Sequence, residues 1–284
     1  MSTTPSSSIS NSISNIMDSS KASSFNGGGS QRLLNLAQQL RLYKTPSTTI
    51  FDNNDEIEEQ RREENEGKVV SQVGFVESST PPIVHPEKFK PKKAAVLICL
   101  FEDDDGVLKV ILTKRSSKLS THSGEVSLPG GKAEEGDAND TQTAMREAKE
   151  EIGLEPSLVN VVTVLEPFLS KHLLRVVPVV GILTDKHLFK PAPNADEVEA
   201  IFNAPLEMFL KDENRTYEER EWMGYKYLIH FFDYKTENKK FTIWGLTAGI
   251  LIRAASVVFQ RPPSFEEQTP NFKVPKLNDV TSMP

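Results

Sequence analysis

Cysteine is nearly absent from this chain of 284 residues. The single cysteine, Cys99, cannot form an internal disulfide, which fits a reducing intracellular setting. Its place in the apolar run AAVLICLF indicates that it packs in a core. Runs long enough to cross a membrane are also lacking, because the most apolar candidate, LTAGILIRAASVVF, is short and carries Arg253. The N-terminus has no secretory apolar core, so we expect neither secretion nor stable membrane insertion.

Positive charge is in deficit as well. The chain has 33 Lys and Arg against 40 Asp and Glu, a formal net charge of −7. No dense stripe of Lys and Arg is present to neutralise a row of phosphates. The composition therefore argues against nucleic acid as a general partner.

Composition divides the chain into four segments. Residues 1–30 are rich in Ser, Thr, Asn and Gly, and we expect them to be disordered. A transit peptide is the alternative, although the first arginine is Arg32. Residues 31–91 combine an amphipathic helix with a polar, acidic linker, and residues 92–262 hold the compact domain. Residues 263–284 form a C-terminal tail.

The stretch QRLLNLAQQLRLYK repeats apolar residues at helical spacing, at Leu33, Leu36, Ala37 and Leu40. The plain interpretation is a helix docked on its own domain or on a partner, which would make a homodimer. The alternative is a membrane-surface or targeting helix.

Apolar runs within residues 92–262 predict an α/β (α+β) domain. AAVLICLFED and VLKVILTKR, joined by the turn DDDG, predict a hairpin. DTQTAMREAKEEIG predicts a helix, with Asn139 or Asp140 capping its start and Gly153 ending it in a left-handed conformation. LTAGILIRAASVVF predicts a closing helix. Further strands are predicted in GEVSLPGG, LVNVVTVLEPFL, LLRVVPVVGIL, EVEAIFNAPLEMFL (running into a short helix), KYLIHFFDY and KFTIW.

Three carboxylates crowd the end of the first of these helices. At about 100° per residue, Glu147, Glu150 and Glu151 fall in one arc that borders the apolar stripe. Their mutual repulsion and the helix dipole cost on the order of 1–2 kcal/mol. Bound Mg²⁺ or Mn²⁺ would reverse that cost, since both prefer clustered oxygen ligands. The plain alternative is a solvated acidic face.

The run GGKAEEGDANDTQTAMREAKEEIGL resembles the signature of the Nudix hydrolases. Its second half, from Arg146 to Leu154, matches that signature in order. The first half departs from it, because the spacing from Gly131 to Arg146 is one residue longer and its acid is Asp137 rather than Glu.

The upstream run LTKRSSKLSTHSGEVSLPGG is similar to a second signature, that of the coenzyme A diphosphatase branch, and the layout resembles its plant members. Two positions depart from it: Ser120 stands where the signature has Arg, and Leu128 where it has Phe. These departures bear on the fit of the substrate rather than on the reaction. The matching residues are Leu112, Thr113, Arg115, Ser116, Gly124, Pro129, Gly130 and Gly131.

The resemblance implies a Nudix fold over residues 92–262, with a mixed β-sheet between helices. It implies cleavage of the pyrophosphate of coenzyme A or an acyl-CoA, a small-molecule substrate, by water attack with Mg²⁺ or Mn²⁺. The products would be a phosphopantetheine compound and adenosine 3',5'-bisphosphate. Two rivals stay open: a Nudix pyrophosphatase for ADP-ribose or a dinucleotide such as NADH, and a non-catalytic nucleotide-sensing module, against which the three glutamates argue.

The resemblance also implies roles for the acidic residues. Glu147 and Glu151 are the firmest expected metal ligands, Glu150 follows, and Arg146 holds these carboxylates in place. The general base is either a helix glutamate such as Glu147 or a loop acid, for which Glu197 is the candidate, although Glu197 could equally be an exposed acid.

Substrate contacts are expected from cations and from the glycine pair. Arg115 and Lys132 flank Gly130 and Gly131 and could bind phosphate oxygens, with ordinary surface charge as the alternative for each cation. Weaker candidates are His122, His172 and Arg175. For localisation we expect the cytosol or the mitochondrion, with a plastid as the further alternative.

Overall fold

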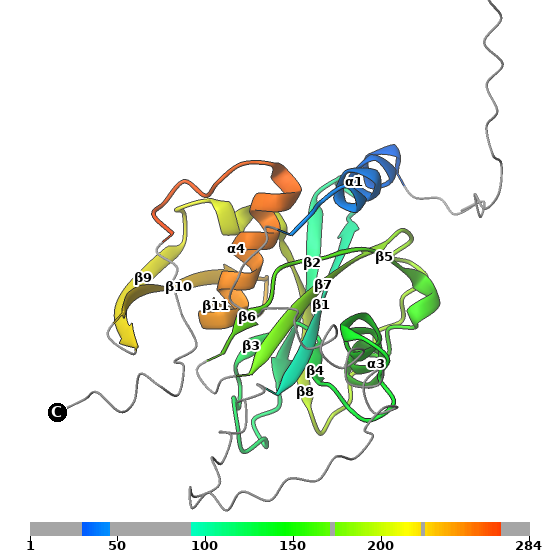
Figure 1. The fold of residues 1–284 in the computed structure, drawn as a ribbon, viewed down its shortest axis with the longest axis horizontal. Helices are drawn as coiled ribbons and strands as arrows, with labels where there is room; N and C mark the ends of the chain where they lie inside the picture. The colour runs from blue at the N-terminus through cyan, green and yellow to red at the C-terminus, as the bar shows by residue number, and fades with distance from the viewer. Residues whose placement is uncertain (1–29, 46–91, 171–173, 223–224, 268–284) are drawn as a thin grey trace, which may run out of the picture.

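A computed structural model describes residues 30–45, 92–170, 174–222 and 225–267 (Figure 1). The expectations for most of the first 30 residues, for the acidic linker and for His172 lie outside these ranges, as does most of the tail.

The centre of the fold is a mixed β-sheet. The predicted hairpin is confirmed, because β1 and β2 pair antiparallel with Leu100 opposite Val110. β1 also pairs with β7 in parallel, with Leu97 opposite Val179. The order of the sheet is β3-β2-β1-β7-β5, with β4 beside β1, β6 beside β7 and β8 beside β2. Its strands are β1 (Lys93–Glu102), β2 (Leu108–Arg115), β3 (Val126–Ser127), β4 (Gly130–Lys132), β5 (Val159–Val164), β6 (Phe168–Leu169), β7 (Arg175–Leu183) and β8 (Val198–Pro205).

A second, three-stranded antiparallel sheet has the order β11-β10-β9. It comprises β9 (Arg215–Trp222), β10 (Tyr225–Lys235) and β11 (Lys240–Trp244). β10 and β11 are the predicted strands KYLIHFFDY and KFTIW, and they pair antiparallel, whereas β9 was not predicted. Its sequence, RTYEEREW, has almost no apolar alternation, and pairing with β10 along its whole length supplies what the sequence pattern lacks.

Helices cover both faces of the mixed sheet (Figure 1). The helix α3 (Asp140–Ile152) packs Ala144, Ala148 and Ile152 against one face, where Cys99 is fully buried as predicted. On the other face α4 (Gly245–Phe259) joins a larger apolar cluster, and short 3-10 helices lie at Pro156–Leu158 and Leu206–Leu210. The predicted arrangement of a mixed sheet between helices is confirmed.

The N-terminal amphipathic helix, α1 (Gln31–Arg41), docks on its own chain. Leu33, Leu36, Ala37 and Leu40 are buried in the cluster shared with β5 and α4. Tyr43, just past the helix, hydrogen-bonds Glu166 at 2.8 Å, and Arg253 of α4 donates to the Tyr43 hydroxyl at 2.9 Å. The apolar face on which the dimer expectation rested is therefore occupied within the chain.

Two details complete the comparison with the sequence patterns. LVNVVTVLEPFL is not one strand but two, because the chain leaves the ladder between Val164 and Phe168. Among the described residues, no helix combines the length and the apolarity that crossing a membrane requires.

Candidate active site

Local sequence signals fix both ends of the helix that carries the glutamates. The Asn139 side chain accepts a hydrogen bond from the backbone N–H of Gln142, and Gly153 adopts φ 71° at the other end, both as predicted. The loop before β8 then covers the helix end, where the N–H of Ala192 donates to Ile152 and that of Asn194 donates to Glu151, each at 2.9 Å. These two backbone contacts were not evident from sequence.

Glu151 is the most buried of the three glutamates, with 2% of its surface exposed. Its Oε2 accepts a 3.1 Å hydrogen bond from the N–H of Gly130, and its Oε1 lies 3.7 Å from a guanidinium nitrogen of Arg115. Burial raises the pKa of Glu151 to about 7, and the nearby charges of Glu147 and Glu197 act in the same direction. The site therefore holds a carboxyl group that does not ionise readily without a cation.

Glu147 lies against the glycine strand β4. A Cβ atom added to Gly131 would stand 2.5 Å from Glu147 Oε1, so the absence of a side chain at Gly131 makes room for this carboxylate. Burial raises the pKa of Glu147, while the neighbouring Arg146 acts against that shift. The glycine pair lies against the helix carboxylates, with Gly130 bound to Glu151 and Gly131 leaving room for Glu147.

Arg146 binds several of the surrounding acids at once. It donates to both carboxylate oxygens of Asp137 at 3.1 and 3.0 Å, and to the carbonyl of Lys132 at 3.1 Å. It also lies 3.2 Å from Glu147 and 2.9 Å from Glu150. The hydrogen bonds from Arg146 hold the pKa of Asp137 well below its usual range. The sequence singled out Asp137 as the unusual spacer acid, but this two-pronged contact required the structure.

Glu150 lies apart from the other two glutamates. Its side chain is 58% exposed and is engaged by Arg146. Within the described ranges, no three Asp, Glu, His or Cys side chains are arranged so that they could hold a metal ion. Glu147 and Glu151 nevertheless fit a hard divalent cation by the chemistry of their oxygens, and by raised pKa values that a cation would offset.

Glu197 lies on the loop that enters β8, and its carbonyl accepts a 2.8 Å hydrogen bond from the N–H of Ser116. It is partly exposed, and its charge raises the pKa of both Glu147 and Glu151. Glu197, far along the chain, thus comes near enough for its charge to act on both helix glutamates, and its role as general base stays a prediction. Ser116 itself is 4% exposed, and no sequence signal indicated that it would be buried.

The candidate substrate-binding residues differ in how they lie relative to the helix glutamates. Arg115 reaches Glu151, and its buried Nε has no hydrogen-bond partner among the described residues. Lys132 is exposed at the end of β4. His122 is exposed and lies 2.8 Å from Glu125, and Arg175 pairs with Asp140 at the start of the helix, away from the glutamates. Of the two departures from the second signature, Ser120 is exposed, whereas Leu128 is buried in the core and concerns packing.

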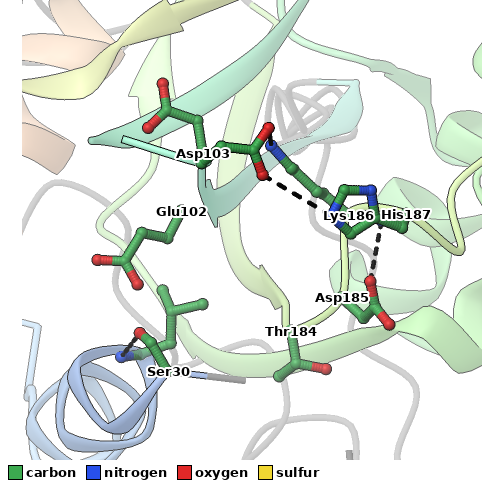
Figure 2. A pocket seen from close by; sticks show the side chains of 9 residues that line it. Ser30, Glu102, Asp103, Thr184, Asp185, Lys186 and His187 are labelled. Carbon is green, nitrogen blue, oxygen red and sulfur yellow. Dashed lines mark hydrogen bonds and ion pairs between the residues drawn. The ribbon is translucent and has the colours of Figure 1, made fainter. Parts of the chain in front are cut away.

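A cavity of about 160 Å³ lies elsewhere, between α1, the β1–β2 turn and the loop after β7 (Figure 2). Four of the nine residues that line it are acidic, and Lys186 pairs with Asp104 at 2.7 Å. None of the residues expected in the active site lines this cavity.

The fold and this acidic site define a Nudix-type domain. The family model described as NUDIX domain matches residues 91–244. The chain therefore belongs to the Nudix hydrolases, pyrophosphate-cleaving enzymes that generally use divalent cations such as Mg²⁺ or Mn²⁺.

Three named proteins are similar to this chain over much of its length. It is 73% identical over 220 residues to Nudix hydrolase 15, mitochondrial, of Arabidopsis thaliana, covering 78% of this chain and 77% of that protein. It is 64% identical over 262 residues to Nudix hydrolase 22, chloroplastic, of the same plant, covering 92% and 84%. It is 38% identical over 163 residues to the mouse peroxisomal coenzyme A diphosphatase NUDT7, covering 57% and 68%.

Proposed function

We propose that this Nudix hydrolase cleaves the pyrophosphate of coenzyme A and acyl-CoA compounds, giving a phosphopantetheine product and adenosine 3',5'-bisphosphate. One observation carries the proposal: Arg115, from the segment that resembles the coenzyme A signature, lies 3.7 Å from Glu151 of the Nudix helix. Two sequence signatures with different meanings thus contribute to one site. The name of the mouse relative supports the same substrate class.

The residues of the helix and of β4 would bind and position the cation. Glu147 and Glu151 would hold the cation, and Arg146 fixes Glu147 through its contacts with Asp137 and the β4 backbone. Bound Mg²⁺ or Mn²⁺ supplies positive charge for the pyrophosphate oxygens and helps to activate the attacking water. Glu150 joins as a third ligand only if its side chain leaves Arg146.

Substrate binding and proton transfer fall to the loops around the helix. Arg115, whose side chain is 24% exposed, binds a phosphate oxygen through guanidinium donors not used by Glu151, and Lys132 adds charge at the exposed end of β4. Glu197 accepts the proton of the attacking water, with Glu147 as the other candidate for that role. Gly130 donates its N–H to Glu151 and Gly131 leaves room for Glu147, so the glycine pair shapes the part of the site in which the pyrophosphate binds.

A panel of four substrates tests the specificity: coenzyme A, an acyl-CoA, ADP-ribose and NADH, compared by kcat/KM under equal Mg²⁺. The proposal expects the two coenzyme A compounds to be the best substrates. If both are poorer than ADP-ribose or NADH, the chain is a Nudix pyrophosphatase of another specificity. If none of the four is cleaved although each binds, the non-catalytic nucleotide-sensing alternative holds.

The location in the cell belongs to the proposal too. Two close relatives carry mitochondrial and chloroplastic in their names. We propose a mitochondrial or plastid location for this chain, with the cytosol as the alternative. Fusing residues 1–45 to a fluorescent protein tests this directly: a signal confined to either organelle supports it, and a diffuse cytosolic signal contradicts it.

A further inference from the structure

Two partly exposed aromatic rings stack on the outer face of the second sheet. Phe231 of β10 stands opposite Trp244 of β11, and their ring centroids lie 5.6 Å apart with an interplanar angle of 8°. Their chain neighbours Phe232 and Ile243 are fully buried on the other face of the same ladder. The stacked pair is therefore not needed to fill the main core.

The pair lies next to the segment that leads into the active site. β11 contacts β3, which lies beside it in Figure 1, and Thr247 at the start of α4 donates a 3.2 Å hydrogen bond to the carbonyl of Val126. Val126 precedes Gly130 by four residues, and four residues span at most about 14 Å. Gly130 in turn binds Glu151. Aromatic surface and carboxylates thus flank the two ends of one short segment.

We propose that Trp244, backed by Phe231, forms the platform on which the adenine ring of the substrate stacks. The inference rests on the proposed function, in which the reacting pyrophosphate carries an adenosine on one side and a pantetheine on the other. Only the adenosine side presents a flat π-system, and aromatic side chains stack on bases without needing hydrogen bonds. A single ribose separates adenine from the pyrophosphate, and the short segment from Val126 to Gly130 links the place of the platform to that of the carboxylates.

Tryptophan fluorescence tests the platform without turnover. The chain contains two tryptophans, so Trp222→Phe leaves Trp244 as the sole reporter. Titration of that variant with adenosine 3',5'-bisphosphate should give saturable quenching, and 4'-phosphopantetheine should give none. Absence of quenching at nucleotide concentrations that inhibit turnover would overturn the platform.

Kinetics supply an independent test with matched variants. Trp244→Ala should raise KM for coenzyme A roughly tenfold with a smaller change in kcat, and Trp244→Phe should retain most of the affinity because a ring remains. The control is Tyr217→Ala, which removes an exposed ring from the opposite face of the same sheet and should leave KM unchanged. Circular dichroism of each variant shows whether the sheet persists.

An unchanged KM in folded Trp244→Ala would overturn the platform while leaving coenzyme A cleavage intact. Failure of the proposed function looks different, because the wild-type protein would then not cleave coenzyme A at all. The fluorescence titration still reports on adenine in that case.

Discussion

A guanidinium nitrogen of Arg115 lies 3.7 Å from Oε1 of Glu151, although the two residues come from separate sequence signatures. The Arg115 Nε is buried without a partner among the described residues, so this side chain is not saturated by Glu151. An arginine with unused donors beside a buried carboxylate is well suited to a phosphate oxygen. In the proposed function, this contact would couple substrate binding to the metal site.

Arg115→Gln should raise KM for coenzyme A by roughly tenfold or more, because a charge-assisted hydrogen bond to phosphate is lost. The adjacent cation Lys114 offers a matched control, since it pairs with Glu199 at 2.6 Å and not with the glutamates of the helix. Steady-state kinetics of Arg115→Gln and Lys114→Gln make the comparison. Equal effects of the two substitutions on KM would mean that Arg115 has no specific role in binding the substrate.

Glu147→Gln and Glu151→Gln should each lower kcat by several orders of magnitude while the fold is kept. Each substitution removes a negatively charged ligand at a site that requires divalent charge. Glu155→Gln is the control, because Glu155 lies past the helix end, pairs with Lys149 and is half exposed. Rates near those of the wild type in both helix variants would contradict the assignment.

The metal-free protein should lose stability as pH rises. Burial raises the folded-state pKa of Glu151 from 4.5 to about 7, so the folded state holds this proton more tightly than the unfolded state. The free energy of unfolding should fall between about pH 4.5 and pH 7, by on the order of 3 kcal/mol from Glu151, and level off above that range.

Urea unfolding at several pH values in EDTA measures this dependence. Glu151→Gln should flatten it and Glu155→Gln should not. Saturating Mg²⁺ should restore stability at high pH, because a cation favours the ionised carboxylates. If the free energy of unfolding instead rose with pH across this window in the wild type but not in Glu151→Gln, the predicted destabilisation by the buried Glu151 carboxylate would be wrong.

The docked helix α1 should contribute to the stability of the whole domain. Leu40 is 1% exposed, whereas Leu42, two residues later, is 81% exposed. Leu40→Ala should lower the free energy of unfolding by roughly 2–5 kcal/mol, and Leu42→Ala should leave it nearly unchanged. Chemical denaturation of both variants checks the difference. Similar small effects would mean that α1 is not part of the cooperative unit.

Much of the fold follows from local patterns in the sequence. The capping of α3 by Asn139 and its end at Gly153 were predictable because each depends on a few neighbouring residues. The parallel pairing of β1 with β7 was not, since register between distant strands depends on tertiary packing. β9 was missed because its charged sequence becomes a strand only through its partner.

In the active site too, some features follow from local sequence and others depend on tertiary contacts. Helical periodicity brings Glu147 and Glu151 to one side of α3, as predicted, whereas the contacts of the glycine pair with them required the structure. The side-chain rotamers could not be predicted. Glu150 turns to Arg146, one helical turn away, because a guanidinium attracts its carboxylate whereas the other glutamates repel it. The arrival of Glu197 beside the helix depends on the backbone contacts of the loop before β8.

The most direct test separates the products formed from coenzyme A in Mg²⁺ by chromatography, with EDTA-treated wild type and Glu147→Gln run in parallel. The prediction is equal amounts of 4'-phosphopantetheine and adenosine 3',5'-bisphosphate from the wild type in Mg²⁺, with almost none in the other two reactions. Intact coenzyme A in the Mg²⁺ reaction, or the same products at the same rate in EDTA, would contradict the account.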